Sequence, residues 1–145
     1  MRTAIMVAAL TITAPVSAAP ATSLQAARQI VQSYYAAINR GDYRTAYLAW
    51  DQKGAASGKS FAAFRAGFAL TASTRVVTYT PVNEDAGMSQ RWIDVPVDVY
   101  ATLKNGRRQH FRGKYTLHRV VAGVGASVRQ QNWHLSSAKL AAVSR

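Results

Sequence analysis

The sequence contains no cysteine among its 145 residues. This absence excludes a disulfide framework, cysteine-ligated zinc or iron–sulfur centres, thiol catalysis and a cysteine-linked lipid anchor. Acidic residues are also scarce, because six Asp and Glu stand against 18 Lys and Arg, which gives a formal net charge of +12. Hydrophobic residues still make up 49% of the chain, enough for the buried core of one domain of this length. The stability of the fold must therefore come from packing alone.

The first 18 residues have the layout of a secretory signal peptide. A basic residue, Arg2, is followed by an apolar stretch over residues 4–16 and by small residues. The apolar stretch is shorter than the about 20 residues that span a membrane, and Pro15 disfavours a buried helix. We therefore expect cleavage after Ala18 or Ala19, export to the periplasm or beyond, and no integral membrane segment, with residues 19–145 forming one domain.

Apolar residues three and four positions apart predict three helices in the first half of this domain. The expected helices cover residues 24–38, 43–50 and 61–68. Each follows a capping residue, namely Thr22 paired with Gln25, then Asp42, then Ser60. Gly41 is placed to end the first helix, and the small residues 51–59 predict a loop.

After residue 71 the hydrophobic period changes to two, which predicts strands. The expected strands cover residues 75–80, 92–103, 108–121 and 129–139, with loops over 83–89 and 122–127 and a frayed end over 140–145. Gly113 interrupts the apolar side of the third strand, which predicts a bend or the close approach of another group. Helices followed by strands predict an α+β domain, with three N-terminal helices packed on an antiparallel sheet of about four strands.

The turn between the second and third strands determines their register. A two-residue turn at the Asn-Gly pair would place cations opposite aliphatic residues. A three-residue turn at residues 104–106, with its glycine in the left-handed region, instead pairs Val99 with Phe111 and Asp98 with Arg112. We expect the second register, because it produces one apolar face and one face on which charges are paired.

Five stretches of the sequence resemble small exported bacterial proteins of the nuclear transport factor 2-like (cystatin-like) superfamily. They are Tyr34–Trp50, Ser60–Phe68, Pro96–Val99, Gly113–Arg119 and Trp133–Leu140. The resemblance implies a curved, cone-like sheet wrapped on the helices, often with an apolar pocket at its open end. It implies no single activity, because the superfamily holds isomerases, dehydratases and binding modules. Relatives often dimerise through the sheet, so a homodimer is one expectation.

Three groups of residues are candidates for a functional site. If the protein is an enzyme, the resemblance favours Asp94 or Asp98 as a base with Tyr100 as a proton donor. The strand pattern, however, turns both acids away from the apolar face and favours ion pairs at the surface. Candidate ligand-binding aromatic residues are Tyr34, Tyr47, Trp50, Phe68, Tyr115 and Trp133, whose spacing also fits a simple core. Candidate anion-binding residues are Lys104, Arg107, Arg108, Arg112 and Lys114.

The spacing of the histidines in the sequence does not indicate a metal site. His110 and His118 lie on one strand about 26 Å apart, so they cannot share an ion, and we expect no metal and no cofactor. Nucleic acid is also not an expected partner, because few aromatic residues alternate with the cations and export separates the protein from nucleic acid.

The sequence as a whole predicts a non-catalytic domain of the cell envelope that binds a small apolar ligand or an envelope protein. Two alternatives stay open: an isomerase or dehydratase with an Asp base in an apolar cone, and a module that binds anionic envelope polymers through the basic hairpin.

Overall fold

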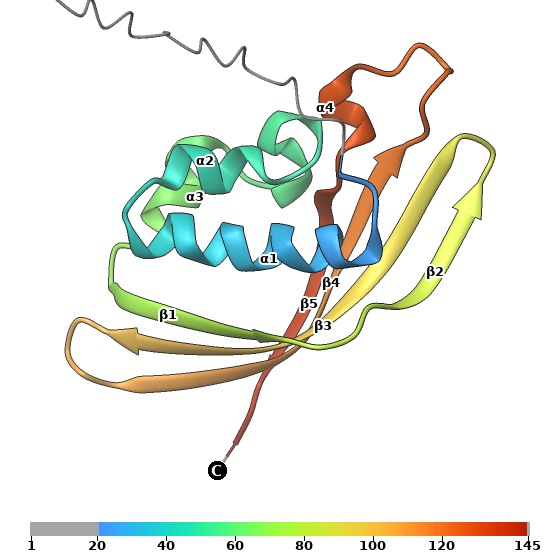
Figure 1. Ribbon diagram of the computed structural model, residues 1–145. Helices are drawn as coiled ribbons and strands as arrows, with labels where there is room; N and C mark the ends of the chain where they lie inside the picture. The colour runs from blue at the N-terminus through green and yellow to red at the C-terminus, as the bar shows by residue number, and fades with distance from the viewer. Residues whose placement is uncertain (1–20, 145) are drawn as a thin grey trace, which may run out of the picture.

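The protein is an α+β domain, described here from a computed structural model over residues 21–144. Its helices lie on one side of an antiparallel sheet (Figure 1). The helices are α1 (Leu24–Asn39), α2 (Tyr43–Leu48), the 3₁₀ helix η1 (Gln52–Ser57), α3 (Phe61–Ala66) and α4 (Val128–Gln131). The strands are β1 (Thr71–Thr78), β2 (Val82–Gly87), β3 (Gln90–Leu103), β4 (Arg108–Val120) and β5 (His134–Ala142). The expected signal peptide and its cleavage site lie outside the described residues.

The sheet has five strands in an open arrangement. Its order is β1-β3-β4-β5, and β2 pairs with the same edge of β3 further along. Between β1 and β2 the chain leaves the ladder over residues 79–81, beside Pro96 of β3. Figure 1 shows the long strands β3 and β4 passing beneath α1 and then rising beside its N-terminal end, which produces a curved sheet. The fold class expected from the sequence is confirmed.

The fifth strand, β2, corrects the expectation of a loop over residues 83–89. Every residue of β2 is exposed, so its side chains carry no alternation that a sequence pattern could show. Backbone hydrogen bonding to β3 forms this strand instead, and Asp85 lies opposite Trp92. An exposed strand of this kind can be recognised only from the structure, once the strand that pairs with it is known.

The helix caps follow the sequence closely. The side chains of Asp42 and Ser60 accept hydrogen bonds from the backbone N–H three residues on, as expected. For α1 the cap is Ser23 rather than Thr22, so the expected position was one residue early. Gly41 adopts a left-handed φ of +75° after α1, which confirms the expected stop.

The β3–β4 hairpin has the register that the three-residue turn predicts. Val99 pairs with Phe111 and Asp98 pairs with Arg112. The turn closes with a hydrogen bond of 2.8 Å from the Leu103 N–H to the Arg107 carbonyl oxygen. The expected close approach at Gly113 is also confirmed, since a Cβ atom there would lie 1.8 Å from the carbonyl oxygen of Lys139 on β5.

The C-terminal region differs from the expected strand over residues 129–139. Ser127 and Gln130 form a capping box that starts the short helix α4, and the strand begins only at His134. The strand then continues to Ala142, which pairs with Phe111, so residues 140–142 do not fray. Pairing with a long β4 supplies the backbone partners that the sequence pattern could not show.

The core lies between the helices and the concave side of the sheet. Its most deeply buried large side chains come from α1 and from strands β3, β4 and β5; they are Val31, Ile93, Val95, Val97, Leu117 and Leu135. Polar anchors join α1 to β1, because the Asn39 side chain exchanges hydrogen bonds with the backbone of Thr74. No helix within residues 21–144 is long and apolar enough to cross a membrane.

Candidate functional site

A cavity that opens to solvent lies between the helices and the apolar face of the sheet. It has a volume of about 350 Å³ and is lined by Tyr34, Tyr35, Gly67, Phe68, Thr71, Thr74, Val99, Ala101, Gln109, Phe111, Tyr115 and Leu140. A second cavity of about 220 Å³ adjoins it through Tyr34, Gly67 and Phe68, and adds Trp50, Ser57, Lys59 and Phe64. We call these two adjoining spaces the cone cavity. Their volumes suit a small molecule, and most of the lining is apolar or aromatic.

Three tyrosines form the polar part of the cone cavity. The hydroxyl groups of Tyr35 and Tyr115 are 2.5 Å apart and are buried, so they satisfy each other. Burial raises the pKa of Tyr35 to about 12, although the hydrogen bond with Tyr115 offsets part of the rise. Burial likewise raises the pKa of Tyr34 and of Tyr115 above the usual range of tyrosine. All three side chains are therefore neutral phenols at neutral pH and can donate or accept a hydrogen bond.

Trp50, which lines the smaller space, carries a buried donor without a partner in the part of the chain that the structure describes. Its side chain is only 8% exposed, and its Nε1–H has no hydrogen-bond partner among the described residues. The indole approaches the Tyr34 hydroxyl, which moderates the pKa of that group, but the geometry does not meet that of a hydrogen bond. A buried donor without a partner costs about 1–3 kcal/mol. A ligand oxygen or nitrogen that accepted this hydrogen would recover that free energy.

Among the described residues that line the cone cavity, one lysine is the only side chain that is charged at neutral pH. Within the described residues its lining includes no Asp, Glu or His, and Lys59 stands at the smaller space. No group of three or more His, Asp or Glu side chains in residues 21–144 is arranged to hold a metal ion. The lining is therefore suited to holding a ligand by packing and by a few hydrogen bonds.

The candidate catalytic residues lie on the opposite face of the sheet. Asp98 and Tyr100 alternate along β3 with Val97 and Val99, which point to the core, and Asp94 lies on the same outer side. Neither aspartate lines the cone cavity. The arrangement of an Asp base inside an apolar cone is therefore not formed by these residues.

Each outer aspartate is the centre of a hydrogen-bond cluster. Asp98 accepts hydrogen bonds from the Tyr79 hydroxyl at 2.5 Å and from Arg112 Nε at 2.9 Å, and its Oδ1 lies 2.6 Å from His110 Nε2. These bonds, led by the one from Tyr79, lower the pKa of Asp98 to about 2 although burial opposes ionisation. The expected pairing of Asp98 with Arg112 is present.

Asp94 is held in the same way further along β3. Burial disfavours its charged form, but hydrogen bonds from Lys114 at 2.6 Å, Thr116 and Asn83 outweigh that effect and lower its pKa. Both acids are buried beneath their partners, whereas the sequence favoured ordinary surface pairs. Their role in this geometry is structural.

The structure places four of the six expected ligand-binding residues at the cone cavity and the other two elsewhere. Tyr34, Phe68 and Tyr115 line the larger space of the cone cavity, and Trp50 lines the smaller one. Tyr47 and Trp133 lie elsewhere, since the Tyr47 hydroxyl donates to the carbonyl oxygen of Lys59 and the Trp133 indole donates to that of Ser23. Sequence reasoning missed Tyr35, because its partner Tyr115 lies 80 residues away in the chain.

The expected anion-binding residues also separate into two groups. Arg112 and Lys114 hold the buried aspartates, at 2.9 and 2.6 Å respectively. Lys104, Arg107 and Arg108 are exposed at the end of the hairpin and form no ion pair with any residue in 21–144. A cavity of about 620 Å³ lies beside this end.

Comparisons with known proteins give a fold but no family. No protein-family model matches the chain, and no curated protein matches it. The structure is similar to the crystal structure of a proposed aromatic ring hydroxylase from Novosphingobium aromaticivorans, with a TM-score of 0.56 and 13% identity over 83% of this chain and 92% of that one. A protein from Kribbella flavida matches at a TM-score of 0.42 and 20% identity, over 79% and 93% of the two chains. The first likeness supports the fold alone.

Proposed function

We propose that this protein is a non-catalytic binding module of the nuclear transport factor 2-like fold. The resemblance of its sequence stretches to that superfamily, its α+β architecture and its likeness to the Novosphingobium structure support this assignment. The protein holds a small, largely apolar molecule that carries one hydrogen-bond acceptor. The cone cavity is the binding site.

The observation that carries this proposal is the buried Trp50 indole beside an apolar cavity. Its unpartnered N–H selects a ligand with an acceptor, and the aromatic rings around it favour a flat apolar body. The surrounding phenols of Tyr34 and Tyr35 stay neutral, so they place no charge in the site. The ligand that fits this environment is an uncharged aromatic or aliphatic carbonyl compound.

The enzyme alternative has less support from the geometry. An isomerase or dehydratase of the expected kind needs an acid that points into the cone. Asp94 and Asp98 instead lie on the outer face, where each accepts three hydrogen bonds. The name of the Novosphingobium protein mentions hydroxylation of an aromatic ring, which agrees with an aromatic ligand in this fold but not with a base supplied by either aspartate.

We also propose that the protein acts in the periplasm or outside the cell, where it meets its ligand or an envelope protein. The signal-peptide pattern of residues 1–18 supports export. Because the protein has no cysteine, its folding does not depend on whether that compartment is oxidising or reducing.

Calorimetric titration with a matched pair of ligands tests the cone cavity. Acetophenone carries a carbonyl acceptor and ethylbenzene has nearly the same shape without one. We expect the protein to prefer acetophenone by about 5- to 150-fold, which corresponds to the recovery of one buried donor. Trp50→Phe keeps a ring but removes the N–H, so it should abolish that preference.

Trp92→Phe is the control for this experiment, because Trp92 packs on His118 at the outer face. It should leave the preference for acetophenone unchanged. Equal affinity of the wild-type protein for the two compounds, or binding of neither, would refute the proposed ligand class. Native mass spectrometry of protein purified from its own cell envelope would then identify the natural ligand.

A further inference from the structure

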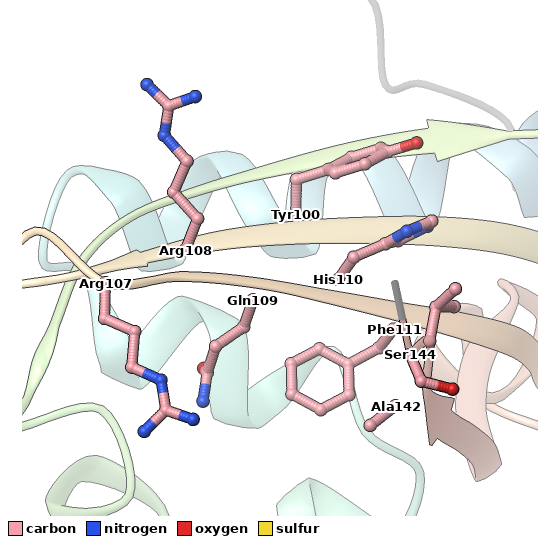
Figure 2. A pocket seen from close by; sticks show the side chains of 9 residues that line it. Tyr100, Arg107, Arg108, Gln109, His110, Phe111, Ala142 and Ser144 are labelled. Atoms are coloured by element: carbon pink, nitrogen blue, oxygen red, sulfur yellow. The ribbon is translucent and has the colours of Figure 1, made fainter.

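A strongly basic groove lies at the hairpin end of the sheet, where it borders the cone cavity at Gln109. Two concavities form it, of about 620 and 340 Å³, and they share Tyr100, Arg108 and Gln109. The larger one opens beside the end of β5, at Ala142 to Ser144, and wraps around β4. Figure 2 shows Arg108 and His110 on one side of that strand, and Arg107, Gln109 and Phe111 on the other. The smaller one continues over β3 to Arg75 on β1. We call this surface the hairpin groove.

The cations of the hairpin groove are not neutralised by the protein. Arg75, Arg107 and Arg108 are exposed and form no ion pair with any residue in the described part of the chain. The neighbouring Arg112 differs, since it is bound to Asp98. The cations of the groove are therefore unpaired among the described residues, whereas the neighbouring Arg112 is paired with an aspartate. Guanidinium groups of this kind recognise carboxylate, sulfate or phosphate oxygens in pairs.

The aromatic ring in the groove is already covered on both sides. Arg75 lies over one face of the Tyr100 ring, with Cζ 4.3 Å from the ring centre. His110 stacks on the other face, at 4.3 Å between centroids and an angle of 16°. The register places the three side chains in one row across β1, β3 and β4. Nucleic-acid bases need a free aromatic face for stacking, so the groove lacks the main feature of a single-strand binding surface.

Hydroxyl and amide groups line the rest of the groove. Ser73 and Thr102 contribute hydroxyls to the smaller concavity, and Gln109 contributes an amide to both. Arg75 and Arg108 lie on strands two steps apart in the sheet, which corresponds to about 10 Å. Anionic groups spaced along an extended chain could contact both, while its hydroxyls bond to the polar side chains between them.

We propose that the hairpin groove binds an acidic polysaccharide through Arg75, Arg107 and Arg108. Carboxylates of the polymer pair with the guanidinium groups, and its hydroxyls bond to Ser73, Thr102 and Gln109. A second copy of this chain is the poorer occupant, because apposing two such faces would bring uncompensated arginines together. The proposal is independent of the ligand in the cone cavity.

Fluorescence anisotropy with a labelled oligogalacturonate tests this proposal. We expect Arg107→Glu combined with Arg108→Glu to weaken binding about tenfold or more at low salt, because the charge at the groove is reversed. Raising the salt to about 0.15 M should weaken the wild-type complex, since exposed charges are screened beyond about 8 Å. Arg75→Lys keeps a charge but loses the planar stack on Tyr100, so it should reduce affinity by a smaller factor, about threefold.

The matched control combines Lys53→Glu with Arg65→Glu. Both residues are exposed and without ion pairs among residues 21–144, so this variant has the same net charge as the groove variant. It should bind within about twofold of the wild type. An equal loss in both double variants would show attraction by net charge only and would overturn the proposal. Tighter binding of oligoglutamate or oligothymidylate than of oligogalacturonate would overturn it as well.

Discussion

At the scale of single residues, the outer aspartates show how one side chain can organise a sheet face that helices do not cover. Asp98 is 3% exposed although it lies on the face away from the core. Tyr79, His110 and Arg112 lie over its carboxylate and supply its hydrogen bonds. A buried carboxylate is stable only with such partners. Their loss should therefore be measurable as a loss of stability.

We predict that Asp98→Asn lowers the free energy of unfolding by about 2 kcal/mol at pH 7, because three charge-assisted hydrogen bonds are weakened. The pKa of Asp98 in the folded protein is lowered to about 2, against about 3.9 in an unfolded chain. A lowered pKa stabilises the folded state above pH 4, and that stabilisation is lost as the pH falls toward 2. Urea unfolding at several pH values should show the variant and the wild type converging over this interval.

Asp85→Asn is the matched control for this prediction, since Asp85 lies on the exposed strand β2. It should change the stability by less than about 0.5 kcal/mol. A gap between Asp98→Asn and the wild type that is the same at pH 2.5 and pH 7 would contradict the assigned role of the carboxylate.

Gly113 provides a second test at this scale. A Cβ atom at this position would meet the backbone oxygen of Lys139 at 1.8 Å, and a backbone oxygen cannot turn aside as a side chain can. Gly113→Ala should therefore separate β4 from β5 and destabilise the protein by about 2–4 kcal/mol, measured by thermal unfolding. Gly87→Ala meets only ordinary contacts with Trp92 and should change little. Similar stability of the two variants would contradict the close packing of these strands.

At the scale of secondary-structure elements, α1 and β1 determine how the helical layer is placed on the sheet. Asn39 at the end of α1 accepts from the Thr74 N–H and donates to its carbonyl oxygen, each at 2.7 Å. At the other end of β1, Arg28 donates to the hydroxyl and carbonyl oxygens of Thr78, each at 2.8 Å. These two anchors hold α1 across β1.

We predict that Asn39→Ala destabilises the protein by about 1–2 kcal/mol, because the backbone of Thr74 loses both of its side-chain partners. The variant should also increase amide hydrogen exchange in β1 more than in β4, since only β1 is released. Gln29→Ala, at an exposed position of α1, serves as the control and should leave exchange in β1 unchanged. Equal exchange in β1 of Asn39→Ala and of the wild type would show that the anchor does not position the strand.

At the scale of the whole molecule, the sheet separates two kinds of surface. Its inner face, with the helices, borders an apolar pocket, and its outer face carries the paired aspartates. The hairpin groove lies at the edge between them and shares Gln109 and Phe111 with the pocket. Three of the 18 basic residues, Arg75, Arg107 and Arg108, gather at this groove without an acidic partner among the described residues. The proposed sites for an apolar ligand and for an anionic polymer are therefore neighbours that meet at Gln109.

Export is a property of the whole chain, and its test is direct. We predict that protein recovered from the periplasm or the medium begins at Ala19 or Pro20, which intact-mass measurement distinguishes. Leu10→Arg interrupts the apolar stretch of the expected signal peptide and should leave the unprocessed precursor in the cytoplasm. Alanine at the same position is the control and should be processed normally. Recovery of the wild-type chain only with residue 1 still attached would contradict export.

Much of the architecture could be predicted from the sequence because it depends on neighbours in the chain. The caps at Asp42 and Ser60 act on backbone groups three residues away, and the hairpin register follows from turn geometry and strict alternation. The placement of Asp94 and Asp98 on the outer face followed from the same alternation. These features need no knowledge of distant segments.

Other features depend on segments that meet only in the folded protein. Strand β2 exists because its backbone pairs with β3, and the tyrosine pair exists because α1 crosses β4. The burial of Asp98 and the unpartnered indole of Trp50 likewise arise from packing around them. The sequence by itself determined the fold class and the faces of its strands, because local geometry and the hydrophobic period depend on residues that are close together in the chain. Only the tertiary structure decided where a cavity remains and which cations stay free, because both depend on contacts between residues far apart in sequence.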